Sequence, residues 1–108
     1  MKTVKLEDVP VTISPRGPRV RPILGTEFAA VTEVLLGSGE TLPAHVTPVD
    51  VLFYVRAGSG YVVIGDDRLP VTEGTIVESP KGIPHGLVAG DGPFDVLVIK
   101  TPNPNWKP

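Results

Sequence analysis

The sequence predicts an all-β domain, a β-sandwich or barrel made of about nine short strands. Its apolar residues alternate or cluster in short runs, and no window carries a sustained helical pattern. Twelve glycines and thirteen prolines cut these runs, so that turn signals recur roughly every eight to twelve residues. A chain of 108 residues suffices for one hydrophobic core and shows no repeat or linker, so residues 1–108 are predicted to form a single domain.

The N-terminal third is predicted to contain two strands joined by an arginine-rich loop. The first strand, 3–13, is interrupted at Pro10, which removes a ladder donor and therefore suits an edge or a bend. The loop, 14–22, reads SPRGPRVRP, and its two interpretations are a solvated connection, which is preferred, and an anion-contacting flap over the mouth of a pocket. A second strand at 28–36 ends at the Gly-Ser-Gly sequence that follows it.

The middle of the chain is predicted to form one strand, a hairpin and a second tight turn. The strand covers 42–46, and the hairpin pairs 49–56 with 60–65 around an Ala-Gly-Ser-Gly turn. A Gly-Asp-Asp sequence at 65–67 then marks a tight turn that leads into a strand at 68–71.

The C-terminal third is predicted to end in another hairpin. A short strand at 75–78 and a stiff, proline-containing loop at 79–84 precede it. The hairpin pairs 85–89 with 94–100 around Gly-Asp-Gly-Pro. The tail, 101–108, is rich in proline and expected to be extended, with Trp106 as its candidate anchor, and the arginines of the chain are expected to be solvated.

Strand parity predicts a homodimer. Successive side chains of a strand face opposite sides, so in 49–56 the interior set contains Val51 and Phe53, and the outward set still contains Leu52 and Tyr54. An apolar outer face must be covered by another strand of the chain or by a second subunit. We therefore expect two copies of the chain to associate through this sheet.

Composition excludes several classes of function. The formal charge is −2 and no basic stripe is present, so nucleic acid is not an expected partner. The absence of cysteine excludes disulfides, thiolate metal sites and a cysteine nucleophile. The N-terminus lacks the apolar region of a secretory signal, and no apolar run approaches the roughly 20 residues of a membrane-spanning helix. A cytoplasmic protein without a membrane partner is the expectation.

The candidate chemistry lies in the stretch 39–85, which contains the only two histidines, His45 and His85. A first pattern at 39–58 has Gly39, then His45 six residues later, then Gly58. A second pattern at 74–89 has glycine, proline, glycine and histidine at fixed spacing: Gly74, Pro80, Gly82 and His85. These patterns resemble the two motifs of the cupin superfamily. The resemblance implies a jelly-roll β-barrel of two antiparallel sheets, with both histidines pointing into the barrel.

The resemblance also implies a metal site, but with an incomplete set of ligands. Metal-binding cupins carry a second histidine where this chain has Thr47, a glutamate where it has Val51, and often an asparagine where it has Ala89. Only His45 and His85 match, so a divalent transition metal (Mn, Fe, Ni, Zn or Cu) would be weakly held, completed by water or a recruited carboxylate. The carboxylates considered for that role are Asp50, Glu33, Glu40 and Glu78.

Three functions remain open from the sequence. The first is a small-molecule-binding cupin whose pocket inside the barrel is lined by His45, Thr47, Val51, Phe53 and His85, with the ligand unidentified. The second is an enzyme, either a metal-dependent dioxygenase or isomerase, or a metal-free one with a histidine as general base. The third is a purely structural, dimerising barrel. A lone histidine in a strand is commonly a hydrogen-bonded core residue, whereas two buried in one cavity cost desolvation, which favours a functional pocket over a purely structural pair.

Overall fold

The computed structural model describes residues 2–108, which form strands apart from one short turn of 3-10 helix, η1 (Leu6–Asp8). The strands are β1 (Thr12–Ile13), β2 (Arg19–Gly25), β3 (Ala30–Leu36), β4 (Thr41–His45), β5 (Asp50–Ile64), β6 (Asp67–Thr72), β7 (Ile76–Ser79) and β8 (His85–Thr101). Nothing helical in this part of the chain is long enough to cross a lipid bilayer.

Two long strands, β5 and β8, organise the fold into two antiparallel sheets. The first half of β8 pairs with β4 and with the second half of β5, which also pairs with β6. The second half of β8 pairs with β3 and with the first half of β5, which also pairs with β7. The sheets therefore run β4-β8-β5-β6 and β1-β2-β3-β8-β5-β7, and they share the two long strands. This is the predicted jelly roll of two antiparallel sheets.

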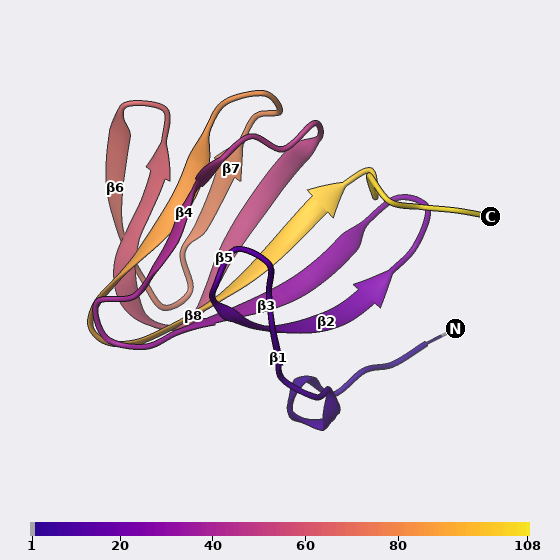
Figure 1. Cartoon of the computed structure of the whole chain (residues 1–108), viewed down its shortest axis with the longest axis horizontal. Coiled ribbons are helices and arrows are strands. Elements are labelled where there is room, and N and C mark those ends of the chain that lie inside the picture. The colour runs from indigo at the N-terminus through magenta and orange to yellow at the C-terminus, as the bar shows by residue number, and fades with distance from the viewer. Residues whose placement is uncertain (1) are drawn as a thin grey trace.

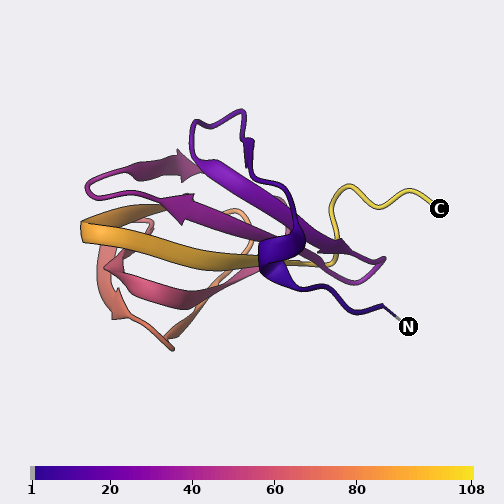
Figure 2. The ribbon, with the colours of Figure 1, turned by 90° about the horizontal axis from the view of Figure 1, so that it is seen from below.

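Figure 1 shows how β8 serves both sheets: it descends in orange, bends sharply, and rises again in yellow. Figure 2 shows the same bend at one end of the molecule, where the strands curl around a common interior. In β5 the change of sheet coincides with two register shifts, between Val55 and Ala57 and between Gly58 and Gly60. Gly58 has a φ of 82°, and a Cβ there would collide with the carbonyl oxygen of Pro93. This crossing therefore requires glycine.

The two hairpins predicted around Ala57–Gly60 and Gly90–Pro93 are wrong. Each pair of predicted strands is one continuous strand, β5 or β8, and the glycines mark a bulge and a corner instead of a reversal. The reversal predicted at 65–67 is confirmed, because Ile64 pairs with Asp67 across a two-residue turn. The strands predicted at 28–36, 42–46, 68–71 and 75–78 are observed within two residues of their expected ends.

The N-terminal prediction needs a second correction. The strand expected at 3–13 is reduced to η1 and the two-residue β1. The loop expected at 14–22 ends early, because β2 begins at Arg19 and pairs with β3. The cause is a contact far along the chain: Arg21 donates to the carboxylate of Glu33 at 2.9 Å and to the carbonyl of Val9 at 3.0 Å. Trp106, the candidate anchor of the tail, is 46% exposed.

The core confirms the predicted strand parity. Val51, Phe53 and Val55 are fully buried, whereas Tyr54 on the opposite face is 37% exposed. The remaining members of the core come from both sheets: Val34, Leu36, Leu42, Val62, Val71, Leu87, Ala89, Phe94, Val96 and Val98. The inward face of the shared strands thus supplies the interior that positions the histidines.

Candidate functional site

A cavity of about 480 Å³ opens between the two sheets, beside the end of β4. Its apolar wall is formed by one side chain from β2, one from β3, one from β4 and one from β8: Val20, Val34, Leu42 and Val98. Its polar lining consists of Ser14, Arg16, Thr32, His45 and Lys100. A volume of this size is typical of a small-molecule site with an apolar body and a few polar groups.

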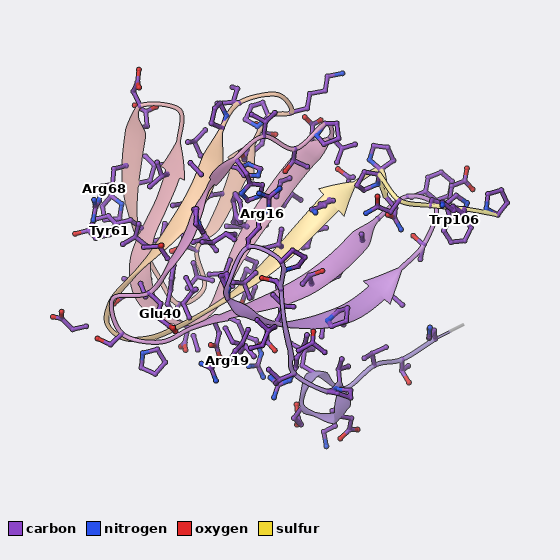
Figure 3. The ribbon with its side chains drawn as sticks, viewed as in Figure 1. Arg16, Arg19, Glu40, Tyr61, Arg68 and Trp106 are labelled. Atoms are coloured by element: carbon purple, nitrogen blue, oxygen red, sulfur yellow. The ribbon has the colours of Figure 1, made fainter. Side chains whose placement is uncertain are left out.

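The loop between β1 and β2 forms one border of this cavity. Ser14 and Gly17 are held by backbone hydrogen bonds within the loop, from Ser14 N to the Pro18 carbonyl (2.9 Å) and from Gly17 N to the Ser14 carbonyl (3.0 Å). Gly17 has a φ of 109°, a conformation that favours glycine. Figure 3 shows Arg16 over the middle of the molecule in that view, and Arg16 lines the cavity. The flap that the sequence offered as the less favoured interpretation is therefore compatible with this geometry.

His45 is the histidine that reaches the cavity. It lies at the end of β4, directly opposite His85 on β8, after a register shift that follows Leu42. The Nδ1 atom is 2.9 Å from the carbonyl oxygen of Pro43, so Nδ1 carries the proton and Nε2 is left as an acceptor. Burial lowers the pKa of His45, and the positive charges of Arg16 and Lys100 lower it further. The ring is therefore neutral at pH 7.

His85 lies against the His45 ring and is only 2% exposed. Both of its ring nitrogens are hydrogen bonded: Nδ1 lies 2.7 Å from Ser79 Oγ, and Nε2 lies 3.0 Å from Thr47 Oγ1. Burial lowers its pKa to about 4, with a further contribution from His45. A neutral ring with both nitrogens satisfied is what a buried histidine requires.

The five predicted pocket residues lie close together, and two of them are the histidines whose rings are described above. The rings of His45 and His85 meet edge to face, with centroids 4.9 Å apart, and Phe53 meets His85 in the same way at 5.1 Å. Thr47 and Val51 are also buried, and Val51 lies opposite Ser79 in the sheet. Of the five, His45 alone borders the cavity.

Two functional candidates were missed by the sequence interpretation. Lys100 has the same parity as Val98 on β8, so its side chain faces the interior, and this parity signal was available in the sequence. Burial lowers its pKa, as does the charge of Arg16. Ser14 had no such signal; its Oγ is buried and has no hydrogen-bond partner within residues 2–108.

The residues around His45 and His85 do not fit a resident metal. Residues 2–108 contain no group of three or more histidine, cysteine, aspartate or glutamate side chains close enough to share one ion. Both nitrogens of His85 are already hydrogen bonded, which leaves Nε2 of His45 as one donor, whereas protein metal sites use three or four.

The four carboxylates considered as extra ligands are placed elsewhere. Glu33 is buried and paired with Arg21 and Arg56, at 2.9 and 3.2 Å. Asp50 accepts a hydrogen bond from the backbone of Lys81, and Glu40 accepts one from the backbone of Gly37. Glu78 is exposed, and it pairs with Leu52, which lies between the inward-facing Val51 and Phe53 of β5.

Comparisons with known proteins agree with this fold. A family model described as a cupin domain matches residues 32–100. Comparison with curated proteins gave no match. Among solved structures, KdgF from Halomonas sp. superimposes with a TM-score of 0.88 at 17% identity, over 97% of this chain and 96% of that one.

Two further structures are similar to the chain. The polyketide cyclase RemF from Streptomyces resistomycificus has a TM-score of 0.83 and 25% identity, over 95% of this chain and 80% of that one. The TT1209 protein from Thermus thermophilus has a TM-score of 0.82 and 24% identity, over 96% of this chain and the whole of that one.

Proposed function

The chain belongs to the cupin domain family, and on that premise we propose that it is a small-molecule-binding cupin whose ligand occupies the cavity beside His45. The observation that carries the proposal is the composition of the cavity: an apolar wall on one side, and Arg16, His45 and Lys100 converging from three separate elements. Converging polar groups in an apolar cavity are the usual features of a ligand site. A barrel that served only as a structural body would gain nothing from partly burying the charge of Lys100.

The two histidines have different roles in this proposal. His45 contacts the ligand, because its unprotonated Nε2 accepts a hydrogen bond from it. His85 packs against His45 and is held by Ser79 and Thr47, so it fixes the position of the His45 ring. The predicted two-histidine pocket thus becomes one contact residue supported by one buried positioning residue.

An enzyme is the second candidate, and one observation favours its metal-free form. Nε2 of His45 is an unprotonated imidazole nitrogen at the border of a cavity, which is the state required of a general base. The polyketide cyclase RemF is a structure of similar fold at 25% identity, so catalysis within such a barrel is a reasonable alternative. The metal-dependent form is not favoured, because the available donors do not fit a resident ion.

A thermal-shift screen of small metabolites, combined with a cavity-filling variant, tests the proposal. A ligand of the folded state raises the melting temperature by an amount that grows with the logarithm of its concentration relative to Kd. Thr32→Trp places a large ring in the cavity and is expected to abolish the stabilisation. Leu69→Trp, on the exposed strand β6, is the matched control and should retain it. Stabilisation that survives in Thr32→Trp would place the ligand outside the cavity and contradict the proposal.

We also propose that the chain forms a homodimer through the outer face of the β7-β5-β8 sheet. Leu52 pairs with Ile99 and Tyr54 pairs with Leu97, so these four side chains share one face. Ile76, which pairs with Tyr54 from β7, is 60% exposed. The exposed Glu78 lies on the same face, opposite Leu52. Apolar side chains gathered on an outer face are typical of a surface that another subunit covers.

A further inference from the structure

We infer that the ligand of this cavity carries an oxyanion, a carboxylate or a phosphate, which is held between Arg16 and Lys100. The inference rests on the proposed function and names the chemical class of the ligand. It follows from three features of the cavity: two cations without carboxylate partners, a neutral acceptor between the two sheets, and an apolar wall.

Lys100 is the first of the two cations, and an interior lysine needs compensation for its charge. It faces inward from β8, is partly buried, and forms no ion pair with any carboxylate of residues 2–108. Within the same residues, no aspartate or glutamate lines the cavity. An ammonium group taken out of water is stabilised by a nearby opposite charge, and a bound anion supplies that charge.

Arg16 is the second cation, and it comes from the loop between β1 and β2. The loop that carries it is fixed by the Ser14–Pro18 and Gly17–Ser14 backbone bonds, so the guanidinium is presented by a defined turn. It is close enough to Lys100 to lower the pKa of that amine. Two cations that repel one another are brought together where an anion binds between them, and the planar guanidinium suits an oxyanion.

The neutral groups define the remainder of the ligand. Nε2 of His45 is an acceptor, so it selects a hydroxyl or N–H donor near the anion. The Oγ of Ser14 is buried at the same border and lacks a partner within residues 2–108, so it is available to the oxyanion as a donor. Val20, Val34 and Val98 supply an apolar surface for the body of the molecule. The expected ligand is therefore a small, partly apolar acid.

Calorimetric titration with charge-matched pairs tests the inference. The probes are benzoate against benzamide, indole-3-acetate against indole-3-acetamide, and 4-methylpentanoate against its amide, with phenyl phosphate as the phosphate arm. We expect the acids to bind at least tenfold more tightly than the amides. The ratio of phenyl phosphate to benzoate affinity distinguishes the two oxyanions. Affinity should fall as salt is added.

Variants assign the effect to the two cations. Lys100→Met and Arg16→Met should each lower the ratio of acid to amide affinity at least tenfold, whereas Lys81→Met, on the exposed loop before β8, should leave that ratio unchanged. Lys100→Met removes a buried charge and so should not unfold the chain, and Arg16→Met lies on a surface loop. Equal binding of acids and amides would overturn the inference and leave the proposed function intact. Absence of binding by every probe would overturn both.

Discussion

His85 and Thr47 share a hydrogen bond of 3.0 Å between Nε2 and Oγ1, across 38 residues of sequence. The other ring nitrogen of His85 is bonded to Ser79 at 2.7 Å. Because these bonds occupy both ring nitrogens of the buried His85, the imidazole that contacts a ligand is that of His45. Thr47, which stands where the cupin motif carries a histidine, is thus a hydrogen-bond partner of His85.

The two hydroxyl partners of His85 should each be required for stability. Ser79→Ala and Thr47→Val leave a buried ring nitrogen without a partner, which costs about 1–3 kcal/mol of unfolding free energy. Thr41→Val, on an exposed position of β4, should change it by less than about 0.5 kcal/mol. Urea denaturation measures all three. An unchanged midpoint in both buried variants would show that these bonds are not formed.

The same burial predicts that acid destabilises the protein. The pKa of His85 is about 4 in the folded chain and 6.5 when unfolded, so between these values the unfolded chain binds a proton that the folded chain does not. The unfolding free energy should therefore fall as the pH decreases from about 6.5 to about 4, by up to about 3 kcal/mol. Burial lowers the pKa of His45 as well, which acts in the same direction.

Denaturation of the natural protein and of His85→Gln across this pH range isolates the contribution. In the variant, the unfolding free energy should no longer show the part of its pH dependence that His85 causes. The raised pKa of Asp95, which is due to burial, has the opposite effect and is common to both proteins. Parallel curves for the two proteins would contradict a proton-excluding environment at His85.

Introducing the two ligands that the cupin motif carries should create a metal site and lower the melting temperature of the metal-free protein. Thr47→His with Val51→Glu places two donors beside His85, but Val51 is fully buried, so the new carboxylate is unpaired without an ion. We expect the double variant to melt at a lower temperature than the parent and to recover with added Zn²⁺ or Ni²⁺. The parent should respond to neither. Recovery absent at every metal concentration would contradict the placement of these positions around one point.

The proposed dimer predicts a defined response to surface charge. Leu52→Lys with Tyr54→Lys introduces like charges at the centre of the outer face and should yield a monomer or an aggregate. Leu69→Lys, on β6, is the control and should remain dimeric. Light scattering coupled to size exclusion measures the mass. A monomeric parent protein at micromolar concentration would end the proposal.

The sequence allowed the fold class and the inward face of β5 to be predicted, because these depend on local alternation. The spacing of two motifs predicted that His45 and His85 lie close together, and in the structure these residues lie opposite each other on β4 and β8. It did not distinguish a bulge from a reversal at Gly58, since glycine serves both, and the difference depends on the carbonyl of Pro93 in another strand.

The site was predicted less completely than the fold. The bond between Thr47 and His85 and the ion pair between Arg21 and Glu33 join distant segments, and no local pattern encodes them. The inward parity of Lys100 was encoded, but a charged residue at the end of an apolar strand is more commonly solvated. The boundary of the cavity is therefore a property of the assembled sheets.

The most direct test of the central claim is the nitrogen NMR spectrum of the two imidazoles during titration with the tightest-binding acid. We expect the Nε2 resonance of His45 to shift with saturation, because that atom contacts the ligand. Both nitrogens of His85 should keep their hydrogen bonds and stay nearly unchanged. Saturable binding that leaves His45 unaffected, or that shifts His85 alone, would contradict it.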